Sequence, residues 1–227
     1  MKKLCAIILV TLIWAGSVCA VTPEFLNELN KNQRKNLFEK KLVINTIKTN
    51  DGPWPRVIIY AVIDSDPFDA MAVYASYDQQ KNYVPEVIKS KPIKHVTPTD
   101  VHVSYERKLP WPLANSHYTT GNKIRRLPNG GYLLEWYLVH SDSVEKSDGR
   151  IRFIPYMDVT IIKYENFIKP NSFFASLLKN SMINDLKKTL DAIIFHIEEI
   201  KDKHPEKLND MKRKILDAFQ GKYVYKL

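Results

Sequence analysis

The hydrophobic periodicity of this chain changes once, near Pro170. Residues 86–168 alternate between apolar and polar side chains, as β-strands do, and turn-forming residues separate the runs. Over residues 172–200, apolar side chains instead recur at helical spacing, which predicts one long amphipathic helix. A sheet with one apolar face needs cover, and a long helix with a matching stripe supplies it. We therefore predict an α+β protein in which a curved antiparallel sheet wraps round a long C-terminal helix, with extra helices at both ends.

The segments outside these two blocks carry their own signals. They predict helices over 24–41, 66–80 and from residue 205, and strands over 42–49 and 57–63. Asp66 is suited to cap the second of these helices, because a carboxylate accepts the free N–H groups of the first turn, and Pro67 fits the first helical position. Within residues 86–168 we expect six or seven antiparallel strands, with hairpins at residues 128–131 and at Asp148–Gly149.

The first 20 residues have the pattern of a secretory signal. Two lysines precede an apolar run from Leu4 to Trp14, and small residues follow up to Ala20. The run is shorter than the roughly 20 residues that a membrane-spanning helix needs. A lipoprotein signal would need small residues directly before a cysteine, but Val18 precedes Cys19, so this alternative is the weaker one. We expect cleavage after Ala20 and an exported protein, either periplasmic or secreted.

The mature chain, residues 21–227, is expected to form a single domain. Its core would cover about 42–200, with a helical extension over 201–227. Both cysteines, Cys5 and Cys19, lie within the signal. A mature chain without cysteine has no disulfide, no thiolate metal site and no cysteine nucleophile.

The chain is basic, with a formal net charge of +9. This charge favours anionic partners, and the predicted C-terminal helix is one place where it gathers. An amphipathic basic helix is suited to transient contact with an anionic membrane surface, although a solvated charged face is the simpler interpretation. No nucleic-acid recognition motif is present, and we expect no nucleic-acid partner. The basic residues at this predicted helix are Lys207, Lys212, Arg213, Lys214 and Lys222.

The segment Tyr105–Asn115, with the sequence YERKLPWPLAN, runs a predicted strand into a Pro-aromatic-Pro corner. Here the chain resembles the START (StAR-related lipid-transfer) family, and the resemblance extends over about Val57 to Ile200. One departure is that Ser116-His117 stands where many START sequences carry an Arg-Asp pair, which puts any role of that pair in doubt. The resemblance implies the helix-grip fold, which plant pollen allergens and polyketide cyclases share.

The resemblance also implies a function. A START-like protein binds a lipid or other hydrophobic ligand in an internal cavity and carries or transfers it, without a cofactor, and we expect a monomer. The alternative is a cavity enzyme of the cyclase/aromatase or hydrolase type that acts on a hydrophobic substrate. Fold alone does not decide between the two.

Arg107 is the most informative candidate side chain. It shares its strand face with Val101, Val103 and Tyr105, so alternation turns its charge inward, where it is costly unless paired. It could anchor a ligand's carboxylate, phosphate or hydroxyl. Alternatively, it reaches out at the strand end or pairs with Glu135 or Glu165.

Aromatic and apolar side chains supply the remaining candidates, with ordinary core packing as their alternative role. The predicted ligand-binding residues are Tyr105, Arg107, Tyr118, Trp136, Tyr164, Leu178 and Met182. A loaded cavity also needs a gate, which we expect at the mouth formed by residues 110–117 and 170–178. The predicted gate residues are Trp111, Phe173 and Phe174.

No metal site and no catalytic residue is predicted. Asp64, Asp66 and Asp69 lack the spacing of a calcium loop, and the six histidines contain no HExxH motif. GxSxG, Walker A and GxGxxG motifs are also absent from the sequence. His117 could act as a polar group that responds to pH, although a surface position is the simpler interpretation.

Overall fold

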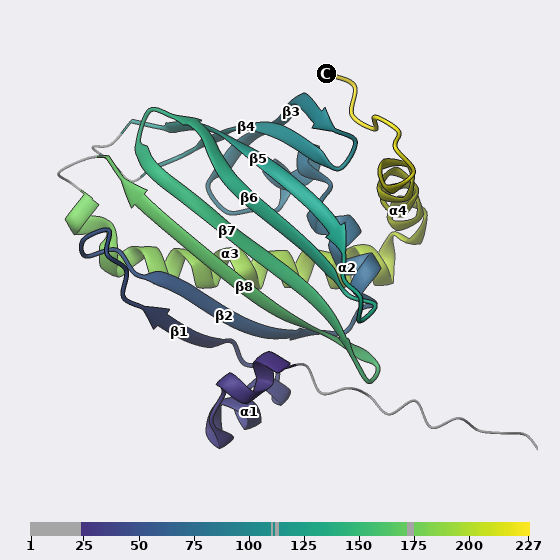
Figure 1. The fold of residues 1–227 in the computed structure, drawn as a ribbon, viewed down its shortest axis with the longest axis horizontal. Coiled ribbons are helices and arrows are strands. Elements are labelled where there is room, and N and C mark those ends of the chain that lie inside the picture. The colour runs from purple at the N-terminus through teal and green to yellow at the C-terminus, as the bar shows by residue number, and fades with distance from the viewer. Residues whose placement is uncertain (1–23, 110, 112–113, 172–174) are drawn as a thin grey trace, which may run out of the picture.

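A computed structural model describes residues 24–109, 111, 114–171 and 175–227, and the side chains of residues 175–181 lie outside that description. Its centre is an antiparallel sheet of eight strands in the order β1-β2-β8-β7-β6-β5-β4-β3 (Figure 1). The sheet is not closed, because β1 and β3 lie at opposite edges. The strands are β1 (Val43–Ile47), β2 (Arg56–Ile63), β3 (Val87–Thr97), β4 (Asp100–Arg107), β5 (Ser116–Arg126), β6 (Tyr132–Ser141), β7 (Val144–Tyr156) and β8 (Val159–Pro170).

One long helix, α3 (Ala175–Lys203), crosses one face of this sheet from end to end (Figure 1). Its apolar stripe is buried against the sheet at Leu190, Ile193 and Ile197. This arrangement confirms the predicted α+β helix-grip fold. The other helical segments are the 3₁₀ helices η1 (Glu24–Glu28) and η2 (Tyr77–Asn82), and the α-helices α1 (Lys31–Phe38), α2 (Pro67–Tyr74) and α4 (Pro205–Phe219).

The sheet buries side chains on both of its faces. The main core lies on the α3 side, where Ile59 and Phe153 are fully buried. A second cluster lies on the other face, where Leu26 and Leu37 from the N-terminal segment cover Tyr60. This double cover explains why β2 is an unbroken apolar run, since a strand buried on both faces does not need to alternate.

Two predicted helices differ from the structure in their bounds, whereas the predicted number of strands agrees with it. The helix expected over 24–41 is two segments, because Asn30 caps α1 and accepts the backbone N–H of Gln33 at 2.9 Å. The helix that Asp66 caps ends at Tyr74, and η2 then follows as a separate turn. The strands between residues 86 and 168 number six, within the predicted range.

The hairpin predicted at Asp148–Gly149 is wrong. β7 passes straight through these two residues, and its hairpins lie at its ends, after Ser141 and after Tyr156. Gly149 instead sits in mid-strand opposite Trp136, and a glycine inside a strand can mark a close approach as well as a turn. The other predicted hairpin, at residues 128–131, joins β5 to β6.

Among the described helices, none is both long enough and apolar enough to cross a membrane.

Candidate ligand-binding cavity

A cavity of about 910 Å³ lies between the sheet and α3. Its floor is made of alternate residues from β4, β5, β6 and β8, and its roof includes Leu186, Thr189 and Ile193 of α3. A volume of this size is within the range of sites that bury small apolar ligands, which is about 300–1,000 Å³. The α3 residues that line the cavity precede the C-terminal part of the helix, so the cavity lies towards the end where α3 begins.

Aromatic rings form much of the floor. Trp136 of β6 packs on Tyr164 of β8, with 5.3 Å between ring centroids, and Tyr105 of β4 stacks on Tyr118 of β5 at 5.1 Å. Trp136 reaches Tyr164 across the strand between them because Gly149 has no side chain at that point. These four rings offer an apolar surface with polar groups at their edges.

The tyrosine hydroxyls facing this space remain protonated. Burial raises the pKa of Tyr105 well above 10.0 and likewise raises the pKa of Tyr164. The Tyr105 hydroxyl donates to Gln80 Oε1 at 2.7 Å and is therefore already used. On the same floor, Asn122 donates to Thr120 Oγ1 at 3.0 Å. The floor therefore combines neutral phenols and amides with apolar carbon.

Arg107 lies at the end of β4 and lines the same cavity. Within the described residues, no carboxylate oxygen lies within 4.0 Å of its guanidinium. The two partners considered from the sequence are both engaged elsewhere. Glu165 accepts from Arg150 and Arg152 at 2.7 Å each on the other face of the sheet, and Glu135 pairs with Arg125 at 3.4 Å. The pairing alternative is therefore wrong, and Arg107 faces the cavity with its charge unmatched by the described side chains.

The mouth of the cavity lies at the strand ends next to the start of α3. Trp111 lines the cavity and is also 92% exposed, so the cavity reaches solvent here. His117 bridges two strand ends, with Nδ1 at 3.0 Å from Asp142 Oδ2 and Nε2 at 3.6 Å from Glu106 Oε1. Its neighbour Ser116 is buried and lines the cavity, because adjacent residues of a strand face opposite sides.

The structure brings most of the predicted site residues together. Leu178, Phe173 and Phe174 lie outside the described residues or side chains, so their placement remains a prediction. That a ligand contacts any of the others also remains a prediction. The predicted residues that line the cavity are Tyr105, Arg107, Trp111, Tyr118, Trp136, Tyr164 and Met182.

Sequence reasoning missed several cavity residues. Tyr74 comes from α2, and Trp54 comes from the segment before β2. Both are far along the chain from the strands predicted to form the floor, so no local sequence pattern indicated that they line the cavity. Asn166 was detectable, because it shares the face of Tyr164 on β8 at a spacing of two. A polar residue on an inward face is the pattern that identified Arg107, and the same test applied to β8 selects Asn166.

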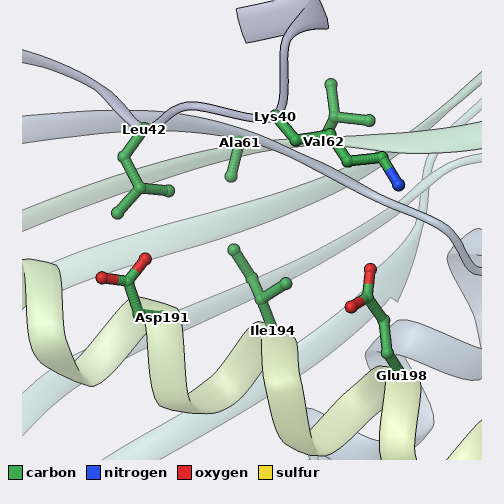
Figure 2. Close-up of a pocket in the computed structure, with 7 residues that line it drawn as sticks. All are labelled: Lys40, Leu42, Ala61, Val62, Asp191, Ile194 and Glu198. Atoms are coloured by element: carbon green, nitrogen blue, oxygen red, sulfur yellow. The ribbon is translucent and has the colours of Figure 1, made fainter.

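A second, smaller pocket of about 180 Å³ lies between α3 and the β1–β2 side of the sheet (Figure 2). Asp191, Ile194 and Glu198 point into it from α3 towards Lys40 and other residues above them. Lys40 forms an ion pair with Asp64, whose backbone N–H donates to Glu198 at 3.2 Å. These bonds tie α3 to the N-terminal segment.

The three aspartates that lack the spacing of a calcium loop each have a different partner. Asp64 pairs with Lys40, Asp66 caps α2, and Asp69 pairs with Lys212 of α4 at 2.5 Å. No group of three metal-binding side chains occurs among the described residues. Arg213 of α4 also has a partner, Asp210, at 2.9 Å, so α4 presents less unpaired positive charge than its lysines and arginine suggest.

Comparison with known proteins supports the fold and adds no sequence family. No family model matches the chain, and no curated protein sequence matches it. The structure is similar to a STAR-related lipid transfer protein of Xanthomonas axonopodis, with a TM-score of 0.64 and 15% identity over 69% of this chain and 93% of that chain.

Two further solved structures widen the comparison. Human StAR-related lipid transfer protein 5 gives a TM-score of 0.61 with 6% identity, over 71% of this chain and 84% of that chain. An aromatase/cyclase from Streptomyces gives 0.55 with 10% identity, over 66% and 97%. The START-like helix-grip fold suggested by Tyr105–Asn115 is thus confirmed, and it is a fold shared by proteins with different activities.

Proposed function

We propose that this protein binds a lipid or other apolar ligand non-covalently in the cavity between the sheet and α3, and carries or transfers it. The observation that carries the proposal is the cavity of about 910 Å³ walled by Trp136, Tyr164, Leu186 and Ile193. Moving apolar surface from water into such a space contributes about 25 cal/mol per Å², so an acyl chain or ring system gains affinity from burial alone. The fold neighbours named for lipid transfer support this proposal by analogy.

The alternative, a cavity enzyme, has less support from the geometry. His117 is held by Asp142 as a catalytic base would be, but its free nitrogen faces Glu106. Ser116 lines the cavity, and its hydroxyl forms a hydrogen bond with the hydroxyl of Ser143 and not with His117. Within the described residues, no nucleophile and base meet inside the cavity, which favours a carrier.

A ligand extraction experiment tests the proposal. The purified full chain would be extracted with organic solvent, and the extract analysed by mass spectrometry before and after incubation with a lipid mixture. We expect one class of apolar molecule to co-purify unchanged. Chemical conversion of the bound molecule would support the enzyme instead.

Two matched tryptophan variants connect the result to the cavity. Thr189→Trp places a large ring on the inner side of α3, whereas Lys188→Trp places the same ring on an exposed position of the same helix. The first should abolish ligand retention and the second should not. Equal retention by both variants would contradict binding in this cavity.

We also propose export and transient contact with an anionic membrane surface during transfer. The basic, apolar and small residues of 1–20 support export, and N-terminal sequencing of the secreted protein should begin at Val21. Membrane contact is supported by Trp111, an exposed aromatic side chain at the cavity mouth beside Lys108. Tryptophan is suited to the interfacial region of a bilayer.

A further inference from the structure

We propose that the ligand of this cavity carries an anionic head group, a carboxylate or a phosphate monoester, that binds Arg107 between the hydroxyls of Tyr118 and Tyr164. This inference rests on the proposed function and names the class of ligand that the cavity selects. It depends on three observations: the charge of Arg107 has no ion-pair partner among the described residues, tyrosine hydroxyls that can donate hydrogen bonds line the same cavity, and the acids on the cavity wall do not pair with it.

The guanidinium of Arg107 is a permanent charge with five donors. Within the described residues it has no ion pair, although other inward or half-buried charges of this sheet do have partners. Lys163, for example, is buried and pairs with Glu28 at 2.8 Å. A cation that lines a largely apolar cavity costs free energy unless an anion joins it, and here the space for that anion is the ligand cavity itself.

Two tyrosines that line the same cavity as Arg107 reinforce this preference. Tyr118 and Tyr164 lie close enough for the positive charge of Arg107 to lower their pKa, but burial has the larger, opposite effect and keeps both phenols protonated. Neither hydroxyl donates to a described residue, unlike that of Tyr105, which is bonded to Gln80. A site with one guanidinium and two free phenol donors matches a group that only accepts hydrogen bonds.

The acids that line the cavity leave this charge in place. Glu86, Asp142 and Asp185 are on the wall, but none of their oxygens lies within 4.0 Å of Arg107. Asp142 accepts from the backbone and ring of His117, and these bonds help to keep the pKa of its carboxyl below its usual value despite desolvation. The proposed anion-binding site therefore lies at the end of β4. The apolar lining beyond it is available to the hydrocarbon part of the ligand.

The test compares ligands that differ only in their head group. Oleic acid, oleyl phosphate, oleyl alcohol and methyl oleate would be titrated into the purified full chain at pH 8, where both acids are ionised. We expect at least one acid to bind about tenfold to a hundredfold more tightly than the alcohol and the ester, which is the range for a hydrogen-bonded charge. The two acids distinguish a carboxylate site from a phosphate site.

Three arginine variants assign the effect to its residue. Arg107→Leu should remove the preference for acid while leaving the affinity for oleyl alcohol within about twofold of wild type. Arg107→Lys keeps the charge and should keep part of the preference. Arg125→Leu is the control, because Arg125 is an exposed arginine of the neighbouring strand that is paired with Glu135.

The outcomes separate the two proposals. Equal affinity for acid and alcohol in the wild type, or an unchanged preference in Arg107→Leu, would overturn the anionic head group and leave a neutral-lipid carrier. Failure of all four amphiphiles to bind the wild type would count against the proposed function itself. A preference lost equally in Arg125→Leu would show that general surface charge, and not this site, attracts the acid.

Discussion

The indole of Trp136 lies over Gly149 on the cavity side of the sheet. A Cβ at Gly149 would lie 2.1 Å from Cζ2 of Trp136 and 2.4 Å from the carbonyl oxygen of Glu165. Both distances are far below van der Waals contact, so only glycine allows the ring to lie this close. The absence of one side chain in β7 thus sets the position of the largest aromatic group on the cavity floor.

Substitution of Gly149 by alanine should damage both fold and cavity. The new methyl group would force Trp136 and the sheet backbone apart, and overpacking of this kind costs about 1–3 kcal/mol. We expect chemical denaturation to show this loss, together with weaker ligand binding. Ser147→Ala, two residues earlier on the same strand face, adds no volume and should have little effect. A Gly149→Ala protein as stable as the wild type would show that Trp136 has room to move.

Glu165 should make stability depend on pH in the acid range. Burial would raise the pKa of this carboxyl, but ion pairs with Arg150 and Arg152 outweigh it and hold the pKa below its ordinary value of 4.5. A lowered folded pKa adds stability above the unfolded pKa, and that stability is lost as the pH falls through the folded value. Glu165→Gln should therefore be less stable at pH 7, by about 3 kcal/mol, and lose less stability on acidification.

The control for this prediction is Glu135→Gln. Glu135 pairs with Arg125 on the surface, where both side chains are more than one third exposed. An exposed pair of this kind contributes about 0–1 kcal/mol, so the change should be small. Unfolding curves measured between pH 3 and pH 7 for both variants would check the difference. Identical pH dependence in Glu165→Gln and the wild type would place the acid sensitivity elsewhere.

The C-terminal tail is fixed to the fold by Tyr225. Its hydroxyl donates to the carbonyl oxygen of Ala75 at the end of α2, and its backbone N–H donates to Nε2 of His95 at 3.2 Å. Tyr225→Phe should lower the free energy of unfolding by about 1 kcal/mol, because the buried carbonyl of Ala75 loses its donor. Tyr223→Phe is the control, since Tyr223 is 66% exposed. Equal stability of the two variants would mean that the tail is not held through its hydroxyl.

Trp111 should affect transfer more than binding. Trp111→Ser removes an exposed aromatic ring from the cavity mouth, so we expect slower ligand transfer between anionic vesicles and unchanged thermal stability. Met157→Ser is the control, because Met157 is 75% exposed at the turn after β7, at the opposite end of the strands. Fluorescence measurement of transfer would compare the two. Slowing by both variants to the same extent would indicate a general surface effect.

Patterns local in sequence predicted much of the fold. The change of period near Pro170 predicted α3, because side-chain spacing along one segment records the face that it buries. The inward parity of Arg107 and Trp136 followed from strand alternation in the same way, and both residues line the cavity. The segment Tyr105–Asn115 added the helix-grip arrangement. These features depend on residues that are neighbours in the chain.

Other features were decided only by tertiary structure. Gly149 serves as a turn residue or as a close-packing residue depending on what lies opposite it, and the opposing Trp136 comes from another strand. Arg107 has no carboxylate partner in the part of the chain that the structure describes, because Glu165 is turned to the other face of the sheet and bound by Arg150 and Arg152. The size of the cavity depends on how far α3 stands from the sheet. The sequence determined which side chains face inward, and long-range packing determined what each one meets there.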